Sequence, residues 1–149
     1  GQGAAQFALA GAVDRLRSLR EPDEDETPIV LAATDPAQPY GAAIAWPPNA
    51  GRPMRSAGAM VVSAGGVPLV WYDRRGHHLV RFAAAASDDR WAESLAVLVK
   101  DGRARGLEVR RIDGVVLADG PSDADVTAAL ELLRRAGFVD GYRGLVLKG

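Results

Sequence analysis

The sequence predicts an α+β fold, in which a curved, mostly antiparallel β-sheet, partly closed as a β-barrel, is flanked by about three helices. Short apolar segments separated by glycine turns over residues 56–82 predict a β-meander. The pair Asp113-Gly114 between two apolar segments is typical of a hairpin. Two later stretches, with apolar residues at helical spacing, predict helices. Together these patterns favour a sheet covered by helices.

The first 26 residues are predicted to lie outside this sheet. Residues 12–19 place Val13 and Leu16 three positions apart, which indicates a short amphipathic helix. Residues 21–26 carry five acidic groups that repel one another, as in a solvated linker. Residues 27–149 are therefore predicted to form one barrel-like module. Because the chain opens without Met and without a secretory signal, we expect it to be a piece of a longer protein.

The strands of the module are predicted from apolar segments and the turns between them. Residues 28–33 read as a buried strand that runs into a rigid turn at Asp35-Pro36. Three strands of the meander follow, and residues 107–118 predict a continuous hairpin around a type I′ turn. Residues 144–147 predict a closing strand.

The two later helices have predicted ends. Residues 87–89 are expected to cap a helix that contains Trp91, and Ser122 is expected to cap the last helix. The last helix is predicted to end at Gly137 in a left-handed conformation, with Phe138 folding back on Leu133 in a Schellman motif.

Composition excludes several kinds of chemistry. The chain has 149 residues, 18 basic and 19 acidic, and no Cys, which excludes disulfides, thiolate zinc sites and cysteine nucleophiles and fits a cytoplasmic location. No apolar stretch approaches the roughly 20 residues of a membrane-spanning helix, so no membrane partner is expected. The motifs G-x-x-x-x-G-K-[ST] and G-x-S-x-G are absent. His77 and His78 are interpreted as exposed turn residues that cannot share one ion, so no metal site is predicted.

Arginines are the candidate nucleic-acid ligands. Arg74 and Arg75 lie at a predicted hairpin tip, and Arg110 and Arg111 lie near the joint between a helix and the strand after it. None of the four stands in or just beyond the last turn of a helix, where the dipole alone would favour a cation. Guanidinium groups bind phosphates with two parallel hydrogen bonds, so these four residues are predicted to contact phosphates. The rings of Tyr40 and Trp46 are candidates for stacking on unpaired bases, whereas Trp71 is expected in the core.

Asp35 is the most informative carboxylate, because it follows a strand and stands on a proline-rich loop. Two interpretations stay open. The carboxylate orients water or stabilises a cationic transition state, or it accepts backbone N–H groups in an Asx-turn that fixes the loop. The second interpretation is favoured.

A segment that reads T-D-P-x-x-P-Y-G, followed by W-P, resembles the C-terminal region of the large helicase-related (Lhr) family. The residues that carry the motif are Thr34, Asp35, Pro36, Pro39, Tyr40, Gly41, Trp46 and Pro47. Gln38 stands where the family pattern has Asn, and Ala45 where it has Pro. The likeness extends from Gln6 to the end of the chain.

This resemblance implies a bacterial superfamily 2 helicase that is ATP-dependent, moves 3′ to 5′ and acts in DNA repair. It places ATP and Mg²⁺ in motor domains upstream and no cofactor in this segment. It implies winged-helix modules before the segment, a β-barrel module, and similarity to a class of DNA glycosylases.

Three functions are therefore weighed. The first is a non-catalytic C-terminal module that contacts single-stranded or tailed duplex DNA and packs against the winged-helix modules. The second is part of a glycosylase site with Asp35 as its carboxylate. The third is an oligomerisation module that forms a homo-oligomer.

Overall fold

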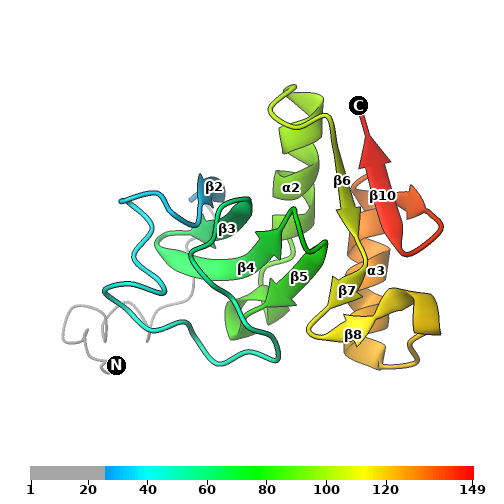
Figure 1. Ribbon diagram of the computed structural model, residues 1–149, viewed down its shortest axis with the longest axis horizontal. Helices are drawn as coiled ribbons and strands as arrows, with labels where there is room; N and C mark the ends of the chain where they lie inside the picture. The colour runs from blue at the N-terminus through cyan, green and yellow to red at the C-terminus, as the bar shows by residue number, and fades with distance from the viewer. Residues whose placement is uncertain (1–25) are drawn as a thin grey trace.

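The computed structural model describes residues 26–149, and its strands form two sheets. The six-stranded sheet has the order β2-β3-β4-β5-β7-β8, and the three-stranded sheet has the order β6-β10-β9. All pairings between the named strands of residues 26–149 are antiparallel except β5 with β7 (Figure 1). The predicted α+β class with a mostly antiparallel sheet is confirmed. The described strands do not close into a barrel.

The elements have the following bounds. The six-stranded sheet contains β2 (Ile29–Ala32), β3 (Ala59–Ala64), β4 (Val67–Asp73), β5 (His78–Arg81), β7 (Arg111–Ile112) and β8 (Val115–Val116). The three-stranded sheet contains β6 (Gly106–Val109), β9 (Val139–Asp140) and β10 (Leu145–Lys148). The helices are α2 (Trp91–Lys100) and α3 (Ala124–Arg135), with 3-10 turns η1 (Ala83–Ala86) and η2 (Leu117–Asp119).

Two of the predicted three helices lie in the described residues. The helix predicted over residues 12–19 and most of the acidic linker lie outside them. α2 stands between the two sheets in Figure 1 and contacts β2, β3 and β10, while α3 contacts α2 and β10. Both helices therefore cover the main core.

The core has two parts, on opposite faces of the six-stranded sheet. The larger part packs α2 and α3 against the sheets, with Trp91, Leu95 and Leu133 fully buried. The smaller part holds Trp71, Val80 and Phe82, and the half-buried Trp46 packs on it. The middle strand β4 is thus covered on both sides, as its apolar sequence predicts.

Tyr72 on β4 joins the six-stranded sheet to the three-stranded one. Its hydroxyl donates to the carbonyl oxygen of Glu108 at 2.6 Å and accepts from the Glu108 amide at 3.1 Å. Burial raises the pKa of this phenol to about 12, so it stays protonated and able to donate.

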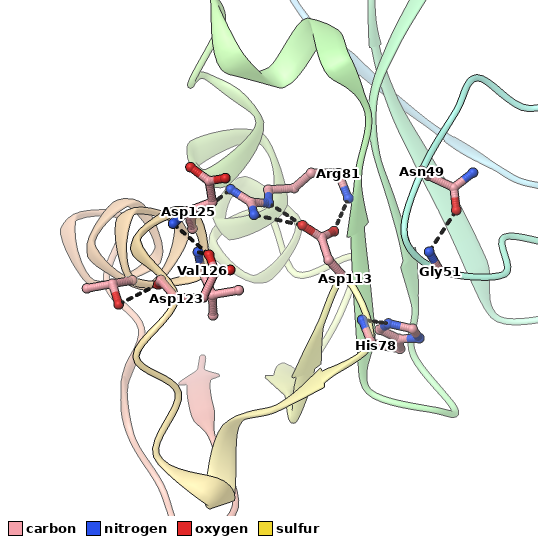
Figure 2. Close-up of polar contacts among 10 residues, drawn as sticks. Asn49, Gly51, His78, Arg81, Asp113, Asp123, Asp125 and Val126 are labelled. Atoms are coloured by element: carbon pink, nitrogen blue, oxygen red, sulfur yellow. Dashed lines mark hydrogen bonds and ion pairs between the residues drawn. The ribbon is translucent and has the colours of Figure 1, made fainter.

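The predicted C-terminal end of α3 is confirmed, whereas its predicted N-terminal cap is wrong. Gly137 has φ +115°, and the Phe138 amide donates to the Leu133 carbonyl at 3.0 Å, which is the predicted Schellman motif. At the start, Asp123 rather than Ser122 is the cap, because its Oδ1 accepts from the amides of Asp125 and Val126 (Figure 2).

The cap predicted for α2 from residues 87–89 is also wrong. The N-cap residue of α2 is Arg90, which makes no side-chain cap. The buried Asp88 instead accepts from the Arg90 guanidinium at 2.7 Å and 2.9 Å, and these hydrogen bonds hold the pKa of Asp88 below its usual value. The Asp88 carboxylate therefore forms an ion pair with Arg90 and does not cap α2.

Two strand predictions need correction. β2 is an edge strand with Ile29 53% exposed, not a buried strand, because only β3 pairs with it. The hairpin predicted over residues 107–118 is split at Arg110. β6 joins the three-stranded sheet, and β7 and β8 form the tight hairpin, with φ +52° at Asp113 and +84° at Gly114 as a type I′ turn requires.

Candidate nucleic-acid interface

The loop that carries the family motif satisfies its own polar groups. Oδ1 of Asp35 accepts from the Ala37 amide at 2.8 Å, which is the predicted Asx-turn. Gln38, only 2% exposed, donates to the carbonyls of Ala33 and Tyr40 and accepts from the Tyr40 amide at 2.7 Å. The amide group of Gln38 therefore holds the turn, and Gln38 is the residue that stands where the family pattern has Asn.

The aromatic residues of this loop are used inside the protein. The ring of Trp46 lies between Tyr40 and Phe82, with ring centroids 6.1 Å and 6.0 Å apart. Trp71 is 4% exposed, and its indole N–H donates to the Met54 carbonyl. The proposed stacking of Tyr40 and Trp46 on bases would therefore have to displace contacts within the fold.

Gly41 makes room for Trp46. Its φ is +85°, and a Cβ at this position would lie 2.7 Å from Nε1 of Trp46. A larger residue would have to push the indole out of the stack, so the Y-G pair of the motif has a packing reason.

The arginines selected from the sequence lie around the turn between β4 and β5. The carbonyl of His77 accepts from the amides of Arg110 and Arg111 at 2.7 Å and 3.2 Å. These two hydrogen bonds tie the break between β6 and β7 to the turn that contains Arg74 and Arg75. Residues about 35 positions apart in the sequence are therefore neighbours in the fold.

Three arginines share one hollow of about 640 Å³, which we call the arginine hollow. Its lining residues are Gly76, Arg110, Arg111, Val116, Ala118, Tyr142 and Arg143. The hollow thus lies between the β4–β5 turn, the β7–β8 hairpin and the loop from β9 to β10.

The loop from β9 to β10 is held against β6 by Gly144. A Cβ on Gly144 would lie 2.0 Å from the Val109 carbonyl oxygen, so only glycine permits this approach. The Gly141 amide donates to the Gly144 carbonyl at 2.7 Å and closes the loop. These contacts place Tyr142 and Arg143 beside Arg110.

The sequence prediction did not include Tyr142 or Arg143 among the nucleic-acid ligands. A signal was present, because an aromatic residue and an arginine between Gly141 and Gly144 mark an exposed loop tip. Their closeness to Arg110 depends on the pairing of β10 with β6, which the sequence does not specify.

The arginine hollow has a net positive charge. Glu108 binds Arg110 through two hydrogen bonds of 2.9 Å and 3.1 Å, which hold the pKa of Glu108 below its usual value. Within residues 26–149, the side chains of Arg111 and Arg143 make no hydrogen bond or ion pair. Two of the three guanidinium groups are therefore available to an anion.

Arg74 and Arg75 lie outside the arginine hollow. Arg74 lines a neighbouring hollow of about 290 Å³ together with His77, Glu108 and Lys148. Arg75 lies over Gly58, where an added Cβ would be 3.1 Å from its Cγ. The structure brings Arg110 and Arg111 together with Arg143 and leaves Arg74 and Arg75 at the margin.

His78 is buried, so the expectation of an exposed turn residue is wrong. It is 8% exposed, and its Nε2 accepts from the Gly114 amide at 3.0 Å (Figure 2). Burial lowers the pKa of His78, and Arg111 lowers it further, so the neutral ring that can accept this bond is favoured. His78 therefore anchors the β7–β8 turn next to Arg111.

Asp113 fixes the same turn from the other side. Its Oδ1 accepts from the Arg81 amide at 2.8 Å, and its Oδ2 accepts from the Arg81 guanidinium at 2.7 Å and 3.0 Å (Figure 2). Arg81 also donates to the Asp125 carbonyl at the start of α3. The strand that carries Arg111 is thus held by a network that reaches α3.

Two classes of site find no support in the described residues. Residues 26–149 contain no group of three or more His, Cys, Asp or Glu side chains placed to hold a metal ion. None of the helices in that range has the length and apolar character needed to cross a membrane.

Comparison with known proteins gives strong similarity to two helicases. A protein of Mycolicibacterium smegmatis named "Lhr helicase/ probable uracil glycosylase" is 46% identical over 98% of this chain, and the aligned stretch is 10% of that protein. A protein of Escherichia coli named "Lhr helicase/uracil glycosylase" is 38% identical over 54% of this chain and 6% of its own length. No protein-family model matches the chain.

The chain spans about a tenth or less of the length of these relatives. The similarity to the Mycolicibacterium protein falls in its C-terminal region and covers nearly the whole chain, as the T-D-P-x-x-P-Y-G motif predicts. The chain therefore belongs to the Lhr helicase family and corresponds to its C-terminal region.

Proposed function

We propose that this chain is a non-catalytic accessory module of an Lhr-type ATP-dependent 3′-to-5′ helicase that acts in DNA repair. The module contacts DNA phosphates through the arginine hollow. ATP and Mg²⁺ act in the motor domains of the parent protein, and this segment needs no cofactor.

The observation that carries the proposal is the pair of guanidinium groups of Arg111 and Arg143. They line one hollow and make no hydrogen bond or ion pair with the described residues. Guanidinium groups that the fold does not use for its own ion pairs are free to bind phosphates. Arg110 contributes its charge as well, although Glu108 offsets it.

The module also has a surface for packing against the rest of the chain. β2 is an edge strand that lies near the start of the described residues, and Ile29 on it is 53% exposed. An edge strand offers unpaired backbone groups and an apolar side chain to a neighbouring domain. We propose that the preceding winged-helix modules pack there.

Binding of the 149-residue chain to a single-stranded oligo-dT, measured by fluorescence anisotropy between 50 and 200 mM salt, tests the phosphate contacts. Two or three contacts give a log–log slope of about −1.5 to −2, because bound counterions are released. Arg111→Gln is expected to weaken binding about five- to tenfold and to reduce the slope by roughly 0.7.

Arg103→Gln is the matched control. It removes the same charge as Arg111→Gln, but from an exposed position before β6, whereas Arg111 lies beyond the other end of that strand. Equal binding by both variants would contradict the proposal. Negligible binding together with a mass that rises with concentration would support an oligomerisation module instead.

A glycosylase site with Asp35 has one supporting observation, which is that the names of the two relatives include uracil glycosylase. Oδ1 of Asp35 accepts from the Ala37 amide, and Asp35 lines neither the arginine hollow nor the neighbouring hollow beside Arg74. The phosphate-binding function is therefore better supported. Loss of uracil excision by the parent protein on Asp35→Asn, with excision retained on Asp89→Asn, would reverse this order.

A further inference from the structure

Tyr142 is the most exposed large hydrophobic side chain of the described residues, at 96%. Within residues 26–149 its hydroxyl makes no hydrogen bond and its ring stacks on no other ring, so it contributes little to the stability of the fold. An aromatic ring left in water is commonly part of a binding surface, because burying it on a partner is favourable.

The ring is presented on a closed loop. The Gly141 amide donates to the Gly144 carbonyl at 2.7 Å, and Gly144 packs on the Val109 carbonyl. A Cβ on Gly141 would lie 2.6 Å from Cγ2 of Val146, so the loop is close-packed at both ends. The backbone that carries Tyr142 is therefore held at the edge of the arginine hollow.

The neighbours of the ring define the chemistry of its partner. Arg143 is adjacent in sequence, and Arg111 lines the same hollow, so cations flank a bare aromatic face. An unpaired nucleotide offers the complement, a flat base joined to a phosphate. An acidic protein surface would match the charge but would not require an aromatic ring.

We propose that Tyr142 is a stacking platform for one unpaired base, and that it makes the arginine hollow prefer single-stranded over duplex DNA. This inference rests on the proposed phosphate contacts and adds the strand preference. In a duplex the base faces are covered by neighbouring bases, so the arginines still find phosphates but the ring finds no partner.

Three probes of equal length separate the contributions, each bound to the 149-residue chain: oligo-dT, a strand of abasic sites, and a blunt duplex. Tyr142→Leu is expected to weaken oligo-dT binding about 5- to 100-fold and to leave the abasic strand and the duplex unchanged. Tyr142→Phe retains the ring and is expected to bind oligo-dT as the parent chain does.

The abasic strand provides the decisive comparison. The parent chain is expected to bind it more weakly than oligo-dT by the same factor that Tyr142→Leu loses, and Tyr142→Leu is expected to bind the two strands equally. Since a side chain that is 96% exposed is replaced, the fold is not at risk.

The outcomes distinguish this inference from the proposed function. If Tyr142→Leu weakens all three probes equally, or none of them, the ring does not stack on a base and the inference is overturned, whatever Arg111→Gln does. If Arg111→Gln leaves all probes unchanged, the phosphate contacts fail, while a Tyr142 effect confined to oligo-dT would still support stacking. A change in oligomeric mass on Tyr142→Leu with unchanged DNA binding would assign the ring to a protein contact.

Discussion

The motif loop, residues 34–47, and the arginine hollow use similar residues for different purposes. In the loop, Asp35 and Gln38 bond to nearby backbone groups, and Trp46 stacks between two other rings. In the hollow, the side chains of Arg111, Arg143 and Tyr142 make no hydrogen bond or ion pair with the described residues. Polar and aromatic groups that the fold satisfies hold the structure, and those left over are available for binding.

The contrast between the motif loop and the arginine hollow explains what the family motif encodes. The T-D-P-x-x-P-Y-G element identifies the family because its geometry demands particular residues: an Asx-turn at Asp35 and a positive φ beside Trp46 at Gly41. The hollow needs Gly144 for the close approach of its loop to β6, but its cations and its ring only have to reach the surface. The recognisable motif therefore marks a structural element, and the binding surface that we propose lies elsewhere.

The largest effect, on both stability and DNA binding, is expected from Gly144→Ala, which displaces the loop that lines the arginine hollow. An added Cβ would lie 2.0 Å from the Val109 carbonyl oxygen, so the loop or β6 must move. We expect the free energy of unfolding to fall by about 3 kcal/mol, as for other overpacked sites, with weaker binding to oligo-dT because Tyr142 and Arg143 shift. Urea unfolding and anisotropy measure the two effects.

A Gly144→Ala variant with unchanged DNA binding would contradict the role of this loop in the hollow. The comparison needs a variant that loses stability without touching the hollow, since partial unfolding alone would lower the fraction of binding-competent protein. Binding is therefore compared at a temperature where both variants are folded.

Gly41→Ala is that variant and is expected to have the next largest effect. The added Cβ would meet the indole of Trp46 at 2.7 Å in a backbone conformation with φ +85°. We expect a loss of about 2 kcal/mol in the free energy of unfolding and unchanged affinity for oligo-dT.

Gly102→Ala is its matched control. Gly102 has φ +77° but no atom within 4 Å of an added Cβ, so it reports the cost of the backbone conformation alone. If Gly41→Ala costs no more than Gly102→Ala, the Trp46 stack does not constrain the loop. If it weakens DNA binding while folded, the motif loop belongs to the binding surface after all.

Local patterns predicted the parts of the fold that local contacts decide. The type I′ turn at Asp113-Gly114 and the Schellman end at Gly137 depend on residues close in sequence, and both are confirmed. The identity of the α3 cap was missed by one residue, because Asp123 and Ser122 are both good caps and only the backbone decides between them.

The predictions that were wrong or missing depend on pairing between strands that are far apart in the sequence. The break at Arg110 arises because β6 pairs with β10 while β7 pairs with β5, and no local signal separates these strands. For the candidate site, the sequence selected Arg74, Arg75, Arg110 and Arg111 as two separate pairs. It could not bring in Arg143 and Tyr142, because their place beside Arg110 depends on the pairing of β10 with β6. The burial of His78 likewise depends on the β7–β8 turn that folds over it.

The smallest expected effect concerns His78, which links the fold to the hollow. Burial first, and then Arg111, lower its pKa, whereas Asp113 and Asp73 act in the opposite direction. The unfolded chain therefore binds the proton more readily than the native one, so the stabilising contribution of the neutral ring is complete above about pH 6.5 and is lost as the pH falls toward the lower native pKa. One proton limits this loss to about 1.4 kcal/mol between pH 6.5 and 5.5.

The variant His78→Gln tests this pH dependence, because its side-chain oxygen can accept from the Gly114 amide but does not titrate. The free energy of unfolding in urea should differ less between pH 7.5 and pH 5.5 for this variant than for the parent chain. An equal difference in both proteins would mean that other groups set the pH dependence, and that the turn beside Arg111 does not depend on the protonation of His78.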